Sequence, residues 1–408
     1  MNRTFIITVG KGKKEEDIIN LAKGFATFLN DFYPEKTVFV GSKDSKRTVE
    51  LIKNEFEKIN GQPFPINNDS FHELKDIDDV QKIFDEIAQI IEDNDNSQIF
   101  INFTSGTKSM SLAAGLCSVI YKTTLLSLSG DRNEEGVVDN QKSTYKRNNL
   151  YRVYDKLNIE KMKKYFNIYR FEEAKEILCD IADINAKESY NLLFDYYDKW
   201  DKFNHGMKLD VINSDNFNDE YFKEQFKKNQ EAIKVLKRNQ DDNQDYYILA
   251  DLINNSQRRF EENKYDDAVA RLYRSIELIA QIKLQKTYNI DSAQIKVETL
   301  KDKVPDEYYN NLLKTSNKNG ILKFPLWKNY ELLSNLNDSL GKSFKENEEL
   351  DEILKARNKS ILAHGKKCIS KEKYEDMKKN TIKLAKILNE NIEEYMNQCK
   401  FPKFKLEE

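Results

Sequence analysis

The sequence predicts an α/β Rossmann-like N-terminal domain followed by an all-α C-terminal domain. Over the first 150 residues, short β-rich runs alternate with helical patterns, a cadence typical of parallel β-α-β units. From about residue 156, Gly and Pro become scarce and apolar residues recur with a period near 3.6, which is typical of amphipathic helices. We expect a sheet-containing domain over residues 1–155, a helical linker region over 156–255 and a second helical domain over 256–408.

Each element of the N-terminal domain is predicted from its own local pattern. Runs rich in β-branched and aromatic residues predict five strands, at residues 3–10, 36–42, 63–67, 97–104 and 123–130. Apolar residues at helical spacing predict the intervening helices, at residues 15–32, 48–59, 79–93 and 108–122. The polar segment 131–154 is either a hairpin or a long loop.

The C-terminal half contains two strongly amphipathic stretches, residues 159–181 and 259–286. Both have an aromatic residue three positions before an alanine, Phe171/Ala174 and Tyr265/Ala268, as tetratricopeptide repeats do. These pairs lie 94 residues apart and no period of about 34 residues links them, so a helical bundle is favoured. We expect a break at residues 320–327 and helix to about residue 398.

Bulk composition narrows the class of protein. The 408 residues carry 66 Lys and Arg against 69 Asp and Glu, a net charge of −3, so contact with nucleic acid requires a local basic cluster. No apolar run is long enough for a membrane span, and the N-terminus predicts a strand followed by charge, not a signal peptide. The four cysteines lie far apart in sequence, which favours a reducing, cytoplasmic environment, and Cys117 is predicted to be in the core.

Two glycine-containing basic loops are the first candidate site. After the fourth strand, the loop "TSGTK" leads into an apolar helix whose first amides lack internal partners and whose dipole end is positive. A second loop follows the first strand, and in a doubly wound sheet these strands flank the crevice where ligands bind, so the loops are expected to face each other. Capping of the helix is the alternative role; two such loops at one crevice favour an anionic ligand. The residues are Gly10, Lys11, Gly12, Thr104, Ser105, Gly106, Thr107 and Lys108.

The loop residues resemble a known ligand loop. "GKGKKEE" matches neither the dinucleotide fingerprint nor the P-loop, which argues against a nicotinamide or flavin enzyme. "TSGTKSM" is similar to the T-G-G-T-K-x-M loop of the CRISPR-associated Rossmann fold (CARF) family, with Ser105 in place of the first glycine. The resemblance adds Ser109 and Met110 to the ligand-binding residues. It implies a homodimer whose paired crevices bind a cyclic oligoadenylate, and a two-fold symmetric ring suits an isologous dimer.

The segment "RNKSILAH" is the second candidate site. Arg357 and His364 are seven residues apart, so on an α-helix they share a face, with a rise of about 10.5 Å between them. Asn358 lies beside Arg357, and Gly365 is a natural stop after the last helical turn. With about a dozen arginines and three histidines in the chain, an accidental match to this spacing has a chance of roughly one in four. A solvated histidine at a helix end is therefore the alternative interpretation.

The C-terminal half resembles the HEPN family, whose signature is R-x(4–6)-H, often with a polar residue after the arginine. A CARF-like domain joined to a HEPN-like domain is the architecture of type III CRISPR ancillary ribonucleases, and the resemblance covers roughly residues 1–150 and 256–400. It implies a single-strand endoribonuclease, activated by cyclic oligoadenylate, that cleaves RNA by 2′-OH attack without a metal or other cofactor. The implied catalytic residues are Arg357, Asn358 and His364.

The roles of these residues stay open at this point. His364 either transfers a proton or orients the phosphate, Arg357 binds phosphate oxygens, and Asn358 either hydrogen-bonds the substrate or holds Arg357. A further hypothesis is slow cleavage of the activator by the N-terminal domain, with Ser105, Thr107 and Lys108 holding the ring.

The alternative function is a non-catalytic CARF-type sensor that regulates a helical adaptor or a nucleic-acid-binding module. The other histidines, His72 and His205, are expected to be loop or surface residues. Arg274 is expected to pair with Glu277 on one helix, beside Arg271.

Overall fold

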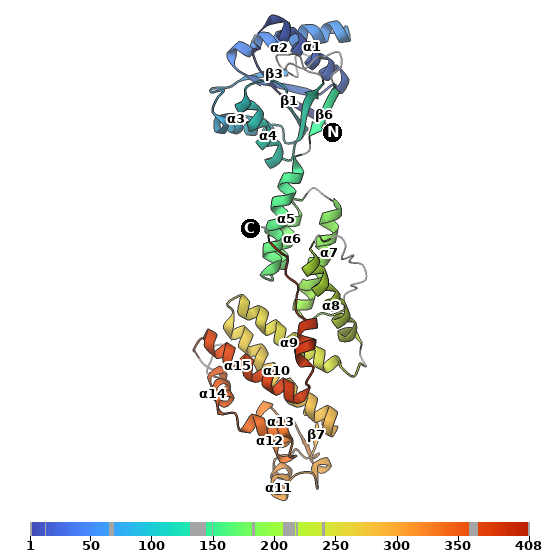
Figure 1. Ribbon diagram of the computed structural model, residues 1–408, viewed down its shortest axis with the longest axis vertical. Helices are drawn as coiled ribbons and strands as arrows, with labels where there is room; N and C mark the ends of the chain where they lie inside the picture. The colour runs from blue at the N-terminus through green and yellow to red at the C-terminus, as the bar shows by residue number, and fades with distance from the viewer. Residues whose placement is uncertain are drawn as a thin grey trace. The chain divides into compact units, whose positions relative to one another are not determined.

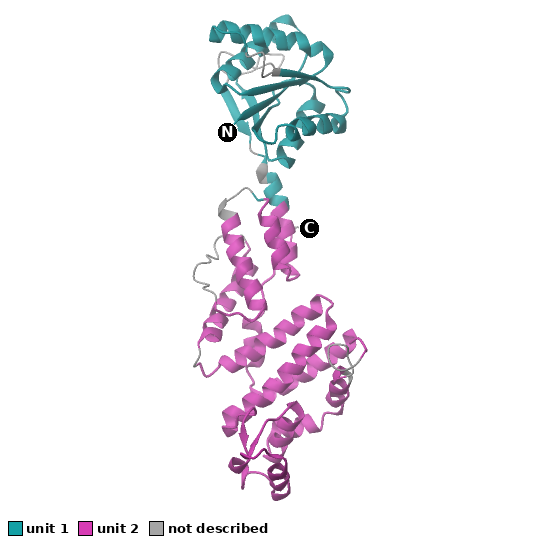
Figure 2. Cartoon of the chain, turned by 180° about the vertical axis from the view of Figure 1, so that it is seen from behind, with its two compact units in different colours: residues 1–157, 181–183 teal, residues 158–180, 184–408 magenta. Residues whose placement is uncertain are grey.

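The computed structural model describes residues 2–12, 14–64, 69–130, 144–148, 150–181, 184–206, 217, 219–238, 241–358 and 366–406. The chain divides into two compact units (Figure 2). Unit 1 comprises Met1–Leu157 and Ile181–Asp183, and unit 2 comprises Asn158–Asp180 and Ile184–Glu408. The predicted fold classes are confirmed, because unit 1 is a Rossmann-like α/β unit and unit 2 is mostly helical.

Unit 1 is built on a six-stranded sheet with the order β3-β2-β1-β4-β5-β6 (Figure 1). The chain adds β2 and β3 on one side of β1, then returns to add β4 and β5 on the other side. The winding direction therefore reverses between β1 and β4. The first five strands are parallel and β6 is antiparallel to β5. The strands are β1 (Arg3–Val9), β2 (Lys36–Gly41), β3 (Asp69–Glu73), β4 (Gln98–Asn102), β5 (Thr124–Ser129) and β6 (Thr144–Asn148).

Helices cover both faces of this sheet. One core joins Phe5 and Ile7 of β1 to α1 and α2, and the other joins Ile6 of β1 and Ile101 of β4 to α3 and α4. A strand buried on both faces needs apolar residues at successive positions, and this explains the continuous run "FII" in β1. The helices are α1 (Glu15–Phe32), α2 (Lys46–Asn60), α3 (Val80–Glu92) and α4 (Lys108–Ile120).

The third strand was predicted at the wrong place. It was expected at residues 63–67, but β3 runs over Asp69–Glu73 and pairs with β2. Proline lacks the N–H that a strand ladder requires, and the sequence has Pro at positions 63 and 65. Phe64 is buried, with its ring centroid 5.0 Å from that of Phe56, so the apolar signal came from a core residue before the strand. Residues 65–68 lie outside the described ones.

The hairpin interpretation of segment 131–154 is correct for the part that the structure describes. β6 pairs with β5 in antiparallel register, from Leu125 opposite Asn148 to Ser129 opposite Thr144. Tyr145 anchors this edge strand, because its hydroxyl donates a 2.9 Å hydrogen bond to the carbonyl of Gly24 in α1. Residues 131–143 lie outside the described part of the chain.

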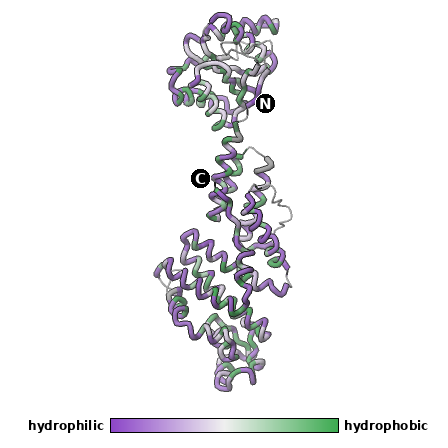
Figure 3. The backbone as a smooth tube through the Cα atoms, viewed as in Figure 1, coloured by the Kyte–Doolittle hydropathy of each residue, from purple (hydrophilic) through white to green (hydrophobic). Residues whose placement is uncertain are grey.

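Unit 2 is a helical assembly with one short hairpin. Figure 3 shows hydrophilic and hydrophobic residues side by side along its helices. The predicted break at residues 320–327 is confirmed, since β8 pairs with β7 there before the next helix begins. The elements are α5 (Tyr151–Asn167), which crosses from unit 1, α6 (Phe171–Leu178), α7 (Ile184–Asp201), α8 (Glu220–Lys237), α9 (Gln244–Glu261), α10 (Tyr265–Tyr288), β7 (Ile295–Lys296), α11 (Asp306–Thr315), β8 (Ile321–Leu322), α12 (Leu326–Asn335), α13 (Ser339–Lys345), α14 (Glu348–Asn358), α15 (Lys371–Leu388) and α16 (Ile392–Gln398).

The two amphipathic stretches each contain a helix end and a new helix start. Tyr169 and Asn263 adopt positive φ angles of 65° and 60° in the turns that precede α6 and α10. The C-terminal segment after α16 packs against the helices of this unit. The Phe404 ring stacks on Phe222 with centroids 4.0 Å apart. None of the described helices combines the length and apolar composition that crossing a bilayer requires.

Candidate functional site

The two glycine-containing loops of unit 1 face each other where the winding of the sheet reverses. They follow β1 and β4, which are neighbours in the sheet. The backbone N–H of Gly10 donates a 3.0 Å hydrogen bond to Oγ of Ser105. A Cβ atom on Gly10 would lie 3.1 Å from the backbone N of Gly106. The prediction that these loops meet is confirmed, and their backbones approach so closely that a side chain at position 10 would push the loops apart by a few tenths of an ångström.

Positive φ angles explain two further glycines. Gly12 has φ +68° and Gly106 has φ +111°, conformations that other residues adopt only with strain. A Cβ on Gly12 would also lie 2.3 Å from Cγ1 of Ile18. The buried Met110 packs beneath Gly106, because its Cε would lie 2.9 Å from a Cβ there. Met110 therefore supports the loop from the core side.

Thr107 caps α4, so the capping interpretation of this loop is correct for that residue. Its Oγ1 accepts a hydrogen bond from the N–H of Met110 at 3.2 Å and donates one to the carbonyl of Ile77 at 2.8 Å. Oγ of Ser109 donates to the carbonyl of Asp78 at 3.0 Å. Both hydroxyl hydrogens are thus used inside the protein and fix the loop against the segment before α3. Donation from these hydroxyls to a ligand stays a prediction.

A buried polar scaffold lies beneath the loops, and sequence reasoning missed it. Oγ1 of Thr8 donates to the carbonyl of Ser105. Oδ1 of Asn102 accepts from the N–H and the hydroxyl of Thr104, at 3.0 and 2.6 Å, and the N–H of Leu128 donates to that hydroxyl at 2.9 Å. Nδ2 of the buried Asn102 has no hydrogen-bond partner among the described residues. Threonine and asparagine inside the apolar runs "FIITV" and "FINF" were the available signal.

The electrostatics of the crevice favour an anion. Lys108 is exposed and forms no ion pair with any described residue, while Lys11, also exposed, lies 3.5 Å from Asp44. Lys108 is the first residue of α4. At this end of the helix the first backbone N–H groups and the positive end of the helix dipole are directed away from the helix, toward the loop. An anion in the crevice can therefore contact the Lys108 ammonium, these amides and the hydroxyl hydrogen of Ser105.

The second site lies in unit 2, on α14 and α10. Nη1 of Arg357 donates a 3.2 Å hydrogen bond to Oδ1 of Asn358, so the expected adjacency of these residues is confirmed. The Arg357 guanidinium also lies over the ring of Tyr273, with Cζ 4.1 Å from the ring centroid. Stacking on an aromatic face holds a guanidinium in place while its edge stays able to bind a phosphate. His364 lies outside the described residues, so its predicted place on the same helix is untested.

The other arginines of α10 have structural partners. Arg274 donates to Glu277 at 2.8 Å, as predicted. Arg271 bonds to the side chain of Asn255 and, at 2.9 Å, to the carbonyl of Asp267. Burial lowers the pKa of Arg271. Among the described residues, no group of three or more His, Cys, Asp or Glu side chains is arranged to hold a metal ion.

Comparison with known families assigns three consecutive parts of the chain. Three family models match consecutive parts of the chain: the Card1 CARF domain over residues 25–161, the Csm6 6H domain over 154–242 and the Csm6 HEPN domain over 237–388. The chain belongs to the CARF–HEPN family of type III CRISPR-associated proteins. Within this CARF–HEPN chain, the loop after β4 lies in the CARF match, the loop after β1 precedes residue 25, where that match begins, and Arg357 and Asn358 lie in the HEPN match.

A solved CARF–HEPN relative shares the whole fold. Enterococcus italicus Csm6 bound to cyclic hexa-2′-fluoro-hexa-dAMP aligns over 98% of this chain and 99% of that one, with a TM-score of 0.62 and 15% sequence identity. At this identity the likeness shows the fold alone. Comparison with curated protein sequences finds no match. The 6H match assigns the helices of residues 154–242 to a domain. No sequence motif in this stretch had suggested such an assignment.

The two described histidines of this CARF–HEPN chain fit the predicted loop or surface positions, because His205 lies in a loop and the His72 side chain is 37% exposed, but both also have a carboxylate partner. His72 lies on the edge strand β3, with Nε2 2.6 Å from Oε2 of Glu86. His205 lies in the turn after α7, with Nε2 3.1 Å from Oδ2 of the fully buried Asp251. Both pairs join segments far apart in sequence, which no local pattern reveals.

Proposed function

We propose that the chain is an endoribonuclease of type III CRISPR defence that a cyclic oligoadenylate switches on. The observation that carries this proposal is the match of a CARF model and a HEPN model to one chain, in that order. Two further features support it. In unit 1, a crevice suited to an anion lies where the winding of the sheet reverses. In unit 2, the Arg357 guanidinium stacks on Tyr273 and donates a hydrogen bond to Asn358.

The proposed activator site is the crevice between the loops after β1 and β4. A cyclic oligoadenylate carries several phosphates, and the exposed Lys108, the amides at the start of α4 and the Ser105 hydroxyl are suited to bind one of them. Enterococcus italicus Csm6 is bound to a cyclic hexanucleotide analogue, and we carry this ligand class over to the present chain. The proposed ligand residues are Gly10, Lys11, Gly12, Thr104, Ser105, Gly106, Thr107, Lys108, Ser109 and Met110, the last as a support from the core.

The proposed cleavage chemistry uses the substrate's own nucleophile. The 2′-OH of RNA attacks the adjacent phosphorus, the bond to the 5′-oxygen of the next nucleotide breaks, and a 2′,3′-cyclic phosphate remains. Arg357 would bind phosphate oxygens and stabilise the charge that develops on them. Asn358, which accepts from Arg357, would hold that guanidinium. His364 would transfer a proton or orient the phosphate. Because these groups supply both charge and proton transfer, the proposed reaction needs no metal.

A homodimer is part of the proposal, and α4 offers a surface for it. Leu112, Leu116 and Ile120 are spaced four residues apart on α4 and are 55%, 44% and 54% exposed. Residues at this spacing share one helix face, so they form an apolar stripe on the helix that begins at the ligand loop. A two-fold contact along this stripe would bring two ligand loops together, as a symmetric ring requires.

The test of the proposed nuclease site separates cleavage from activator binding. Arg357→Ala and His364→Ala should each abolish cleavage of a fluorophore–quencher single-stranded RNA, because each removes a group that acts on the reacting phosphate. Both variants should bind cyclic hexa-adenylate as the wild type does in calorimetry. Arg274→Ala, which removes an exposed arginine paired on α10, is the matched control and should keep both properties. Full cleavage by Arg357→Ala would contradict the assignment.

Two related hypotheses about the activity of this chain predict different results in these assays. A non-catalytic sensor would bind the ring and cleave no RNA under any condition. Slow cleavage of the activator, for which Ser105 and Lys108 retain unused donors, would appear as linear oligoadenylate on chromatography, and the Arg357→Ala variant would still produce it. The four cysteines are free thiols, which supports the proposed cytoplasmic location.

A further inference from the structure

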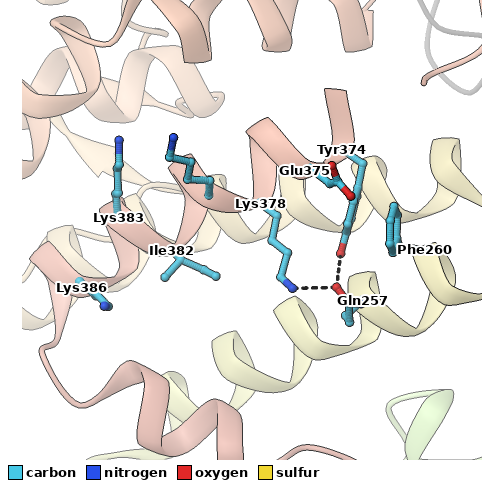
Figure 4. A pocket seen from close by; sticks show the side chains of 9 residues that line it. Gln257, Phe260, Tyr374, Glu375, Lys378, Ile382, Lys383 and Lys386 are labelled. Carbon is cyan, nitrogen blue, oxygen red and sulfur yellow. Dashed lines mark hydrogen bonds between the residues drawn. The ribbon is translucent and has the colours of Figure 1, made fainter. Parts of the chain in front are cut away.

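A basic groove in unit 2 uses none of the residues assigned above. It lies between α9 and α15 and has a volume of about 550 Å³. Figure 4 shows Lys383 and Lys386 toward one end and Lys378, Tyr374 and Phe260 toward the other. The residues that matter for its chemistry are Gln257, Phe260, Lys378, Lys379, Lys383 and Lys386.

Two of these lysines lack an opposing charge in the described chain. Lys379 and Lys383 are exposed, and no ion pair among the described residues involves either of them. They are four residues apart on α15, where like charges weaken a helix. Lys386 pairs with Glu393 at 2.8 Å, and both side chains are exposed. Glu375 also lines the groove, 3.9 Å from Lys371, so the lining holds four lysines against one carboxylate and presents a net positive charge.

Lys378 strengthens this argument because it is half-buried against a neutral partner. Its Nζ donates a 2.7 Å hydrogen bond to Oε1 of Gln257, which also accepts from the Tyr374 hydroxyl at 3.1 Å (Figure 4). Burial lowers the pKa of Lys378, the charge of Glu261 opposes this shift, and the charge of Lys400 adds to it. An anion between Lys378 and Lys400 would offset the desolvation cost of the buried Lys378 ammonium, and it would also weaken the repulsion between the two ammonium groups.

A second cavity continues the groove. It has a volume of about 360 Å³ and shares Gln257 and Lys378 with the first, so the two cavities adjoin. It adds Arg258 and Lys400 to the lining. Arg258 is 3% exposed and pairs with Asp201 through Nε at 2.7 Å and with Asp251 through Nη2 at 3.4 Å, while its Nη1 has no hydrogen-bond partner among the described residues. Glu261 also lines this cavity. The unused N–H of Arg258 can donate to an acceptor in this cavity, and Lys400 adds a further positive charge to its lining.

We propose that these adjoining cavities form one groove that binds the backbone of single-stranded RNA, outside the site of cleavage. This inference rests on the proposed ribonuclease function. A line of positive charges over two connected cavities suits an extended polyanion better than a single phosphate. Phe260 is half-buried and stacks on Tyr374 with centroids 4.3 Å apart. An aromatic ring beside a basic track is the combination that binds single strands without reading their sequence.

The groove predicts that RNA length matters. Single-strand sites hold about 4–16 nucleotides, so a strand of about 4 nucleotides that fills the cleavage site leaves little or no chain for the groove, whereas a much longer strand can extend into it. Removing lysines from the groove should therefore weaken binding of the long strand and leave cleavage of the short one unchanged. An acidic peptide would also be attracted by the lysines, and the experiment has to distinguish it from RNA.

The test uses the full chain with the paired substitutions Lys379→Gln and Lys383→Gln. Binding of fluorescein-labelled oligouridylate is measured by anisotropy at several salt concentrations, in the Arg357→Ala background so that the strand stays intact. Each lysine–phosphate contact adds about 0.7 to the slope of log affinity against log salt for single strands, so two contacts give about 1.4, or about 25-fold at 0.1 M salt. The control pair is Lys314→Gln with Lys318→Gln, two exposed lysines outside both cavities.

We expect the groove variant to lose about 25-fold in affinity with a shallower salt slope, and the control to bind as its parent does. Equal affinity and slope in the groove variant, with the wild type cleaving RNA, would overturn the groove and leave the proposed function intact. Polyglutamate serves as the acidic peptide in the same assay. If the groove variant loses affinity for polyglutamate but keeps its affinity for RNA, the groove binds acidic peptides and the proposed RNA groove is overturned. A wild type that neither binds nor cuts RNA would remove both proposals.

Discussion

Replacing Gly10 by alanine should loosen the activator crevice. The added Cβ would lie 3.1 Å from the backbone N and 3.2 Å from Cα of Gly106, and 3.3 Å from Oγ of Ser105. Two of these three atoms belong to the backbone, so a rotamer change cannot relieve the contact. The loops must separate by a few tenths of an ångström, which stretches the 3.0 Å hydrogen bond from Gly10 N–H to Ser105.

The size of the effect follows from these contacts. Overpacking of this kind costs about 1–3 kcal/mol, and weakening one hydrogen bond costs about 0.5–1.5 kcal/mol. If about 1.4 kcal/mol of the total is expressed in ligand binding, the Kd for cyclic hexa-adenylate rises about tenfold. Calorimetry measures the Kd, and hydrogen exchange of peptides from β1 and β4 measures the local loss of stability.

Gly61→Ala is the matched control for this change. Gly61 caps the C-terminal end of α2 with φ +75°, and a Cβ there would meet no atom within 4 Å. The substitution costs about 1–2 kcal/mol of stability through backbone strain alone. α2 starts after the C-terminal end of β2 and runs back toward the N-terminal ends of the strands. Gly61 therefore lies at the opposite end of the strands from the crevice. Activator binding by Gly10→Ala as tight as that of Gly61→Ala would refute the assignment of the crevice.

Three further outcomes follow from the structure. Tyr273→Leu should lower RNA cleavage about 2- to 30-fold, since the stacking of Arg357 contributes about 0.5–2 kcal/mol; Tyr273→Phe should restore it, and equal rates for all three proteins would exclude a role for the ring. Lys108→Met should raise the Kd for the activator about 10- to 150-fold, the equivalent of about 1.5–3 kcal/mol for a charged hydrogen bond, and an unchanged Kd would remove Lys108 from the site. Burial raises the pKa of Cys117 from 9.0 to about 12, so its contribution to stability should be complete below pH 9 and decline as pH rises toward 12. Iodoacetamide at pH 8 should spare Cys117 in the folded chain, and its rapid labelling there would show that the core is open.

The strands and helices of unit 1 were predictable because each carries its own local signal. "RTFIITV" and "QIFIN" are apolar at successive positions, as strands buried on both faces are. The helix of residues 15–32 has its expected bounds in α1. The third strand failed because β3 is an edge strand with the polar sequence "DSFHE", while the nearby Phe64 belongs to the core and attracted the prediction.

The crevice was predictable in its position but not in its hydrogen bonds. Alternation of strands and helices, with reversal of the winding beside β1, places the two loops together. Which hydroxyls stay available depends on the segment before α3, where Ile77 and Asp78 accept from Thr107 and Ser109. These partners are about 30 residues away in sequence, and no local pattern connects them.

The Arg357 site shows the same limit. The motif and the neighbouring Asn358 are visible in the sequence, whereas Tyr273, whose ring carries the guanidinium, lies on another helix. The lysines of α15 are likewise visible as residues, but only the fold sets them beside Gln257 and the unpaired donor of Arg258. Long-range packing therefore decides which charged groups face a cavity and which face solvent.

The most direct measurement is RNA cleavage by the full chain in EDTA, with and without a cyclic oligoadenylate. The account predicts that cleavage appears only when the ring is added, persists in EDTA and leaves 2′,3′-cyclic phosphate ends. Cleavage at the same rate without the ring, cleavage that EDTA abolishes, or no cleavage in the presence of a bound ring would contradict it.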